Sequence, residues 1–368
     1  YPRLGDRVYA APHSFIANLP KFMKAAEAEA SHVLLKLGSI DVAPESYVSV
    51  KPEKLFGRHC AILGATGGGK SWTTARIIEE CLRYKTKIIL LDATGEYRGF
   101  DGEHVANFHL GAPVNTAKSS APCTLPQTSF IESDFIALFE PAGKVQGPKL
   151  RAAIRSLRLA ALAPHVATGG IIKKIDQSKV PIMTEEAKAG IAEKLDDPQQ
   201  AFDVWKLVSQ IEQECVYPDG FGSARGQKDF TKWGGDSGEV SFCLSLMSRI
   251  NGILSSSSFE CVFKSKAPAL TEKISSFVSN EDRLLRICLS GVAFEFKARE
   301  IVANVIGRHL LNMARNGAFK SRPVVVIVDE AHNFLGRQIG ADDAVARLDA
   351  FELIAKEGRK YGLNICLS

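Results

Sequence analysis

Gly64-Ala65-Thr66-Gly67-Gly68-Gly69-Lys70-Ser71 fills every position of the phosphate-binding pattern G-x-x-x-x-G-K-[ST]. The run before it, His59 to Leu63, is short and apolar and predicts a buried strand, whereas Trp72 to Tyr84 has apolar residues at helical spacing. In a strand, loop and helix of this kind, backbone N–H groups curl around a phosphate and the helix N-terminus adds partial positive charge. We therefore predict a nucleotide phosphate site rather than a glycine-rich turn that binds nothing.

The residues of this loop have different predicted roles. Lys70 reaches the terminal phosphates and is a predicted catalytic residue, and the Ser71 hydroxyl is a predicted Mg²⁺ ligand. The residue after the motif and an acid at the end of the next strand complete the predicted nucleotide-binding set. That set is Gly64, Ala65, Thr66, Gly67, Gly68, Gly69, Lys70, Ser71, Trp72 and Asp92.

Asp92 ends the apolar run Lys87–Leu91 and begins Asp-Ala-Thr-Gly. The pattern Asp-x-x-Gly is typical of the γ-phosphate sensor of GTPases. However, the chain has no Asn-Lys-x-Asp segment for reading guanine, and the spacing from Lys70 is short. Two interpretations stay open, a nucleotide-binding acid and a structural acid at the end of a strand.

A second strong pattern is Pro323 followed by Val324-Val325-Val326-Ile327-Val328-Asp329-Glu330. Its apolar, β-branched run predicts a buried parallel strand that delivers two carboxylates at its carboxyl end, where open α/β sheets bind ligands. Asp329 is the predicted Mg²⁺ ligand, and Glu330 is the predicted base that polarises the attacking water. An ATP hydrolase usually has this second acid, whereas a kinase or nucleotide switch does not require it. The alternative is that Asp329 only caps a following helix.

Strands alternate with helices in two parts of the chain, which predicts an α/β fold with a parallel, doubly wound sheet. Residues 1–57 are predicted to be a β-rich N-terminal domain, and residues 58–128 the first part of the nucleotide-binding core, with 101–128 a loop of little order. Residues 129–215 read as a helical insertion, and 216–368 as the second part of the core. Ala346–Gly358 is a predicted helix within that last part.

Composition limits the class of protein. The chain has 368 residues, 45% of them hydrophobic, with a net charge of +5 that permits a nucleic-acid partner without requiring one. Its eight cysteines include no C-x-x-C pair, which argues against zinc and favours a reducing cytoplasm. The longest apolar run is too short to cross a membrane. Because the chain starts at Tyr1 and stops at Ser368 within an apolar run, we expect the natural protein to be longer.

The chain resembles the HerA family of hexameric DNA translocases, relatives of the FtsK motors. The resemblance covers most of residues 40–368. It rests on Arg58–Gly67, on Asp92-Ala93-Thr94-Gly95-Glu96-Tyr97, on Val326–Phe334 and, most specifically, on Ala355–Gly362. The family typically has Pro-His in place of Ala93-Thr94, and its next strand normally ends Ser-Gln-Arg-Pro, a segment that lies outside this chain.

The resemblance implies a RecA-like P-loop core with a helical insertion and a small N-terminal β-barrel-like domain. It implies a cytoplasmic homo-hexamer that hydrolyses ATP with Mg²⁺ between subunits and moves double-stranded DNA through a central channel, as a translocase or helicase. Arg359 matches the arginine that a neighbouring subunit supplies to the γ-phosphate, with Lys360 as the fallback. The implied partner is an effector, either a NurA-like nuclease or a sirtuin-like or other effector of antiphage defence.

Two points stay open at this level. Arg151, Arg155 and Arg158 form a basic stripe that either touches DNA phosphates or is a solvated face. The ring either moves along DNA or serves as an ATP-regulated assembly platform that activates its effector without long-range transport.

Overall fold

The computed structural model describes residues 7, 9, 11–12, 15, 33–41, 43–65, 67–220, 228–334, 337–339 and 346–368. Thr66 of the phosphate loop lies outside the described residues, as does most of the predicted N-terminal domain before Val33. No helix in the described ranges is both long and apolar enough to span a bilayer.

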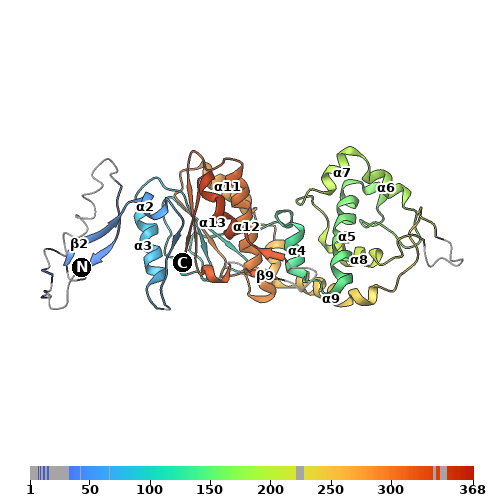
Figure 1. The fold of residues 1–368 in the computed structure, drawn as a ribbon, viewed down its shortest axis with the longest axis horizontal. Helices are drawn as coiled ribbons and strands as arrows, with labels where there is room; N and C mark the ends of the chain where they lie inside the picture. Colours follow the sequence, from blue (N-terminus) through green and yellow to red (C-terminus); the bar gives the residue numbers. More distant parts are fainter. Residues whose placement is uncertain are drawn as a thin grey trace.

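The molecule is elongated, with a central sheet between a small β-ribbon and a helical lobe (Figure 1). The ribbon pairs β1 (Leu35–Ile40) with β2 (Ala43–Val50) in antiparallel register. It is followed by the short helix α2 (Pro52–Phe56), which has proline at its first turn, where the missing N–H costs nothing. This two-stranded ribbon is all that the described residues show of the predicted N-terminal barrel.

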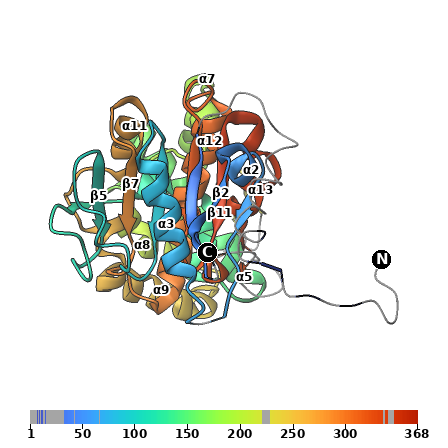
Figure 2. The same ribbon diagram turned by 90° about the vertical axis from the view of Figure 1, so that its left-hand side faces the viewer.

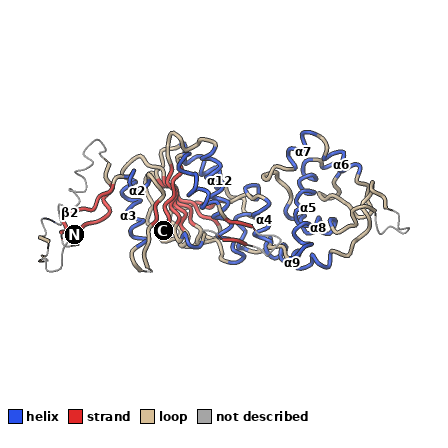
Figure 3. The backbone as a smooth tube through the Cα atoms, viewed as in Figure 1, coloured by secondary structure: helices blue, strands red, loops and turns tan. Residues whose placement is uncertain are grey.

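Among the described residues, the central sheet has seven strands, and every neighbouring pair in it is parallel. Figure 3 shows these strands gathered between the flanking helices. Their order across the sheet is β3-β11-β8-β4-β7-β5-β6. The strands are β3 (Cys60–Ala61), β4 (Ile88–Asp92), β5 (Val105–Leu110), β6 (Ala121–Cys123), β7 (Leu284–Cys288), β8 (Val324–Val328) and β11 (Leu363–Leu367). The predicted α/β class with a parallel sheet is confirmed.

Helices cover both faces of this sheet, as α3 (Lys70–Leu82) and α12 (Ala298–Arg315) show in Figures 1 and 2. Successive residues of a strand point to opposite faces, and β4 is buried throughout, so each face receives half of its side chains. Ile88 and Leu90 pack in the cluster that includes α3, whereas Ile89 and Leu91 pack in the cluster that includes α12. This two-sided burial explains the near-continuous apolar sequence of the central strands.

The helical lobe lies between β6 and β7 in the chain. The helices of this stretch are α4 (Glu132–Phe139), α5 (Gly143–Leu162), α6 (Val180–Glu186), α7 (Ala189–Leu195), α8 (Leu207–Glu214), α9 (Val240–Ser255), α10 (Glu260–Phe263) and α11 (Leu270–Ser279). The last of them, α11, does not belong to the lobe but lies beside the sheet next to α12 (Figure 1). Helix α9 packs against both α5 and α8, so the helices continue beyond the predicted boundary at residue 215. Short strands β9 (Arg337–Ile339) and β10 (Ala346–Leu348) pair near α4.

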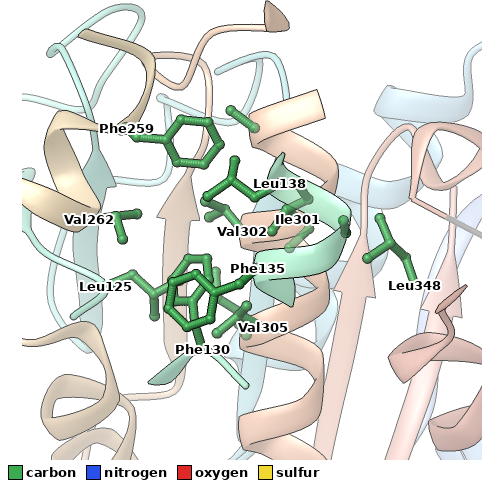
Figure 4. Packing of buried hydrophobic residues seen from close by; sticks show 14 of the residues in the cluster. Leu125, Phe130, Phe135, Leu138, Phe259, Val262, Ile301, Val302, Val305 and Leu348 are labelled. Carbon is green, nitrogen blue, oxygen red and sulfur yellow. The ribbon is translucent and has the colours of Figure 1, made fainter. Parts of the chain in front are cut away.

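An apolar cluster joins α4 to the core (Figure 4). Phe135 and Leu138 of α4 face Ile301 and Val305 of α12 in that view, and the tilted rings of Phe130 and Phe135 have centroids 5.9 Å apart. All of these side chains are 5% exposed or less. This packing fixes the near end of the helical lobe against the helix that covers one face of the sheet.

Two local predictions were wrong. Residues 101–128 are not a plain loop, because β5 and β6 within them extend the sheet beyond β7. The predicted helix Ala346–Gly358 divides into β10 and α13 (Ala350–Glu357), followed by the turn Gly358–Tyr361. In both segments the neighbouring strand supplies the hydrogen bonds, and local sequence does not reveal that partner.

Candidate functional site

The phosphate loop leaves β3 at the carboxyl edge of the sheet and leads directly into α3. Gly67 and Gly69 have φ of 76° and 81°, a region in which a side chain would be strained. Gly69 is the residue before the first turn of α3, so these two glycines turn the loop back onto the helix N-terminus. Lys70 Nζ donates a hydrogen bond to the carbonyl oxygen of Gly64 over 3.1 Å, which closes the loop on itself.

The predicted acids lie at the same edge. Since β3, β4 and β8 are parallel members of one sheet, the loop after β3, Asp92 at the end of β4 and Asp329 after β8 all lie at the carboxyl ends of their strands. The final strand β11 separates β3 from β8. Ser368, the residue after β11, accepts a hydrogen bond from the hydroxyl of Thr74 in α3 over 3.2 Å, so this edge of the sheet meets the start of α3 near the end of the chain marked C (Figure 2).

Tyr97 connects the helix to the acidic strand. Its hydroxyl donates to Asp329 Oδ1 over 3.2 Å and is also hydrogen-bonded to the side chain of Thr74, one turn beyond Ser71. Tyr97 is only 4% exposed, so the contact is shielded from water. One buried hydroxyl therefore holds the first turns of α3 and the predicted Mg²⁺ ligand together.

Asp329 is the most perturbed acid of this edge. Burial, reinforced by the negative charges of Asp92, Glu330 and Glu96, raises the pKa of Asp329 to about 7, although its bond with Tyr97 acts in the opposite direction. Its second oxygen, Oδ2, is buried and has no hydrogen-bond partner. A buried, unpartnered carboxylate oxygen costs free energy, so this atom is poised to accept a cation or a donor that binds nearby.

Glu330 follows in a strained conformation. Its φ of 51° and ψ of 42° are left-handed, which is uncommon for a residue other than glycine. Its carboxylate is half-buried, and Oε2 lies 3.2 Å from Nδ1 of His332. Such strain concentrates at functional sites, where the surrounding structure over-determines the backbone.

Both carboxylate oxygens of Asp92 already have partners within the chain. Asp92 is fully buried; Oδ1 accepts from the backbone N–H of Gly95 over 2.7 Å, and Oδ2 accepts from Tyr97 N over 3.2 Å. Oδ2 also pairs with Arg286 of β7 at 2.7 Å, and Arg286 is buried as completely. This geometry favours the structural interpretation of Asp92, because both oxygens shape the turn that delivers Tyr97.

These residues fit a bound magnesium ion. Mg²⁺ prefers oxygen ligands, and one or two carboxylates with substrate phosphates usually hold it. The unpartnered Oδ2 of Asp329, the hydroxyl of Ser71 at the start of α3 and the neighbouring acids supply oxygen atoms and negative charge of this kind.

Trp72 is not packed into the core. It is 84% exposed and lines a pocket of about 660 Å³ between α3 and the segment after Tyr97. The pocket is lined by Ser71, Trp72, Ala75, Glu79, Leu82, Glu96, Tyr97, Gly99 and Phe100.

Arg359 lies away from the phosphate loop of its own chain. It stands in the turn Gly358–Tyr361, before the first residue of β11, whereas the loop follows the last residue of the parallel strand β3. Arg359 is exposed. Burial lowers the pKa of the His59 imidazole, and the positive charge of Arg359 lowers it further, which places Arg359 near the entry to β3.

The basic stripe of α5 is largely neutralised within the chain. Arg151 pairs with Glu132 at 3.0 Å, and Arg155 pairs with Asp196 at 2.8 Å. Arg158 is buried and donates to the carbonyl oxygens of Leu195 and Pro198. These contacts favour a structural role over DNA binding.

Sequence reasoning missed Tyr97, Arg286 and Thr74. Tyr97 belongs to a motif that was recognised, but its hydroxyl is 232 positions from its partner in the chain. Arg286 sits in an apolar strand, and a charge in a fully buried strand is a signal for a buried partner.

Comparisons with known proteins agree with the motifs. The family model described as the central domain of the helicase HerA matches residues 35–208. A protein named "Probable helicase MJ1565" from Methanocaldococcus jannaschii is 38% identical over 64 residues, which are 17% of this chain and 12% of that protein. The aligned stretch thus spans only a small part of the curated relative.

Solved structures of the bacterial conjugative coupling protein TrwB are also similar. The unbound form aligns over 95% of this chain and 67% of TrwB, with 16% identity and a TM-score of 0.45. A complex of TrwB with the ATP analogue ADPNP aligns over 94% of this chain and 70% of TrwB, with 16% identity and the same TM-score of 0.45.

The family match begins at β1 and includes the phosphate loop, α3 and the Asp92–Tyr97 turn. Residues 35–208 are therefore similar to the central domain of the HerA helicase, in agreement with the resemblance that the sequence motifs predicted.

Proposed function

We propose that this protein is an ATP hydrolase of the HerA type that uses Mg²⁺-ATP to move double-stranded DNA. The observation that carries the proposal is the shared hydroxyl of Tyr97, which bonds Thr74 of α3 and Asp329 after β8. A nucleotide held at the N-terminus of α3 would lie beside both acids that follow β8.

Each residue of the site has one role in this proposal. The backbone N–H groups of Gly64–Ser71 bind the phosphates, and the ammonium of Lys70 leaves the carbonyl oxygen of Gly64 for the terminal phosphate. Glu330 accepts a proton from the attacking water, and the strained backbone aims its carboxylate. Ser71 and Asp329 would hold Mg²⁺, which supplies charge neutralisation on the phosphate oxygens when bound.

The position of Arg359 supports action between subunits. Arg359 is exposed and lies at the amino ends of the strands, whereas the phosphate loop of its own chain lies at their carboxyl ends. From there it is suited to reach the nucleotide of a neighbouring subunit. We therefore propose a homo-hexamer with ATP at the interfaces and Arg359 acting in trans. Duplex DNA would occupy the central channel, and the helicase family match of residues 35–208 supports this choice of substrate.

An effector protein completes the proposal, either a NurA-like nuclease or a sirtuin-like or other effector in DNA processing or antiphage defence. The eight free thiols of the chain suit a reducing cytoplasm. The division into an N-terminal domain, two core segments and a helical insertion is also part of the proposal, with the insertion extended to include α9.

One observation favours the platform alternative, in which ATP regulates an effector without long-range transport. Val180, Met183 and Phe230 of the helical lobe are 55%, 59% and 71% exposed. The backbone bond from Lys179 N to Thr231 O places Val180 and Phe230 in adjacent segments. Exposed apolar side chains that gather in one place are typical of protein interaction sites.

The test compares ATP hydrolysis and directional displacement of a DNA-bound third strand by the purified protein, with Lys70→Ala as the inactive control. The translocase proposal expects DNA-stimulated hydrolysis and displacement, both lost in the control. ATP hydrolysis that is not stimulated by DNA, without strand displacement, would favour the platform. A protein that neither binds nor hydrolyses ATP would overturn both.

A further inference from the structure

Two cysteines face each other beside the phosphate loop. Cys60 of β3 and Cys366 of β11 are register partners in neighbouring parallel strands. Neighbouring strands lie about 4.8 Å apart, which is within the span of about 4.4–6.8 Å that a disulfide bridges between Cα atoms. Both side chains belong to the cluster under α3, so they point to the same face of the sheet.

Their surroundings give the two thiols different reactivity. Cys60 is half-buried on an edge strand, whereas Cys366 is fully buried. The Cys366 thiol donates a hydrogen bond to Cys60 and lowers the pKa of Cys60 to about 7, although burial acts against this. A low-pKa, accessible thiol next to a resolving cysteine is the arrangement found in redox-sensing sites.

Neither a third thiol nor a metal site is expected to take the place of this pair in a reaction. Cys81 of α3 lies near Cys366, but burial raises the pKa of Cys81 to about 12, so it stays a protonated thiol. Within the described ranges, no cluster of three or more His, Cys, Asp or Glu side chains is arranged to hold a metal, so the pair is not half of a visible zinc site.

We propose that Cys60 and Cys366 are a hydroperoxide-reactive thiol pair, in which Cys60 is the nucleophile and Cys366 the resolving thiol. The resulting disulfide ties β3 to β11 at the base of the phosphate loop.

The chemistry balances with one hydroperoxide per pair. The Cys60 thiolate attacks the terminal peroxide oxygen, the O–O bond breaks, and the alcohol or water leaves with the proton that Cys60 gave up. Cys366 sulfur then attacks the Cys60 sulfenic acid; the S–S bond forms, the S–O bond breaks, and the departing hydroxide takes the Cys366 proton as water. Two thiols are oxidised and one peroxide is reduced.

A disulfide between Cys60 and Cys366 would affect the phosphate loop, because the loop continues directly from β3. Ile62 N donates to Leu367 O over 2.8 Å, and the loop begins at Gly64, so any shift of β3 against β11 moves the phosphate-binding amides. Because Cys60 is only half-buried, a reducing thiol can reach the disulfide at its sulfur, which makes the change reversible. We expect at least fivefold weaker ATP binding after oxidation; this consequence rests on the proposed function.

The chain contains a matched control pair. Cys215, directly after α8, and Cys243 of α9 are also hydrogen-bonded to each other. Both are fully buried, and burial is the main cause that raises the pKa of each. Both pairs are therefore in contact. They differ in that Cys60 is partly exposed to solvent and has a lowered pKa, whereas Cys215 and Cys243 are buried and have raised pKa values.

The test treats the full chain with hydrogen peroxide, blocks free thiols and maps disulfides after tryptic digestion without reductant. We expect peptide 59–70 linked to the peptide that begins at Tyr361, reversal by dithiothreitol, and no link between Cys215 and Cys243. In Cys366→Ser, and in Cys366→Ala as a second variant, Cys60 should stop at a sulfenic acid that dimedone traps. Free Cys60 after treatment, oxidation of Cys60 without the link, or an equal link in the control pair would overturn the proposal.

Binding of a fluorescent ATP analogue to reduced and oxidised protein tests the consequence. Equal affinity in the two forms would overturn the coupling to the loop. If the reduced protein binds no nucleotide, the proposed function fails, while the disulfide map still decides the thiol chemistry.

Discussion

Tyr97 donates a hydrogen bond to Asp329 over 3.2 Å, from the turn after β4 to the acid after β8. The same hydroxyl bonds Thr74, so a single side chain connects the first turns of α3 to the acid. Asp92, which pairs with Arg286, accepts a hydrogen bond from the backbone N–H of Tyr97 and so holds the turn in place. The site is thus assembled by a buried polar network whose members depend on one another.

Replacing Tyr97 with Phe keeps the ring and removes this bond. We expect the Mg²⁺ concentration for half-maximal hydrolysis to rise about tenfold, because second-shell partners orient metal ligands. Nucleotide binding without Mg²⁺ should stay within about twofold, as the loop amides are untouched. The control is Tyr84→Phe, just beyond the C-terminal end of α3. An unchanged Mg²⁺ dependence would refute the positioning role of Tyr97.

Glu330→Gln removes the proposed base and keeps the size of the side chain. We expect ATP binding to persist while the rate of hydrolysis falls about 10²- to 10⁴-fold. Single-turnover hydrolysis and equilibrium binding measure the two effects separately. The neighbouring variant His332→Ala, which removes the 3.2 Å partner of Glu330, should reduce the rate far less. If Glu330→Gln turns over at the parental rate, another residue is the base.

Arg359→Ala should abolish turnover and leave ATP binding to the isolated chain unchanged, because Arg359 is remote from its own phosphate loop. Lys360→Ala, at the adjacent exposed position, is the matched control and should retain activity.

Mixing Arg359→Ala with Lys70→Ala tests the direction of action. If the arginine acts across an interface, a chain with an intact loop meets a neighbour with an intact arginine, and part of the activity returns. Absence of any recovery in mixed assemblies of normal size would argue that Arg359 does not act in trans.

Asp92→Asn breaks the buried pair with Arg286 and leaves a positive charge without its partner. We expect a loss of about 3 kcal/mol in the free energy of unfolding, measured with denaturant. The double variant with Arg286→Met should lose less than the sum of the two single variants, since no uncompensated charge remains. Additive losses would mean that the two residues do not interact as the structure shows.

Alkylation of Cys60 should depend on pH with a midpoint near 7, because the lowered pKa of Cys60 makes the thiolate available as pH rises through that value. Iodoacetamide labelling followed by mass spectrometry from pH 5 to pH 9 measures the profile. Cys366→Ser replaces the thiol donor, and Cys366→Ala removes it, so the midpoint in the alanine variant should move toward the ordinary value of about 8.5. A midpoint that stays near 7 in the alanine variant would assign the lowered pKa to another cause.

The sequence predicted the parts of the fold whose signal is local. Val324–Val328 could be recognised as a buried strand because its apolar, β-branched run fits burial on both faces, and α3 because a glycine turn precedes its helical spacing. Strands β5 and β6 escaped recognition because their polar residues, such as Asn107 and His109, find partners in Ser119 and Ser120 only after folding. Helix α9 was missed, although its burial against α5 and α8 is extensive.

By itself, the sequence determined that a glycine loop, a lysine and two acids follow strands of one α/β sheet, because periodicity and turn chemistry act over a few residues. Only the tertiary structure decided which of these groups touch. It assigned both oxygens of Asp92 to Arg286 and to its own turn, left Oδ2 of Asp329 unpartnered, and set Cys60 opposite Cys366. Strand order creates these contacts between residues far apart in the chain, and burial then fixes their charge and reactivity.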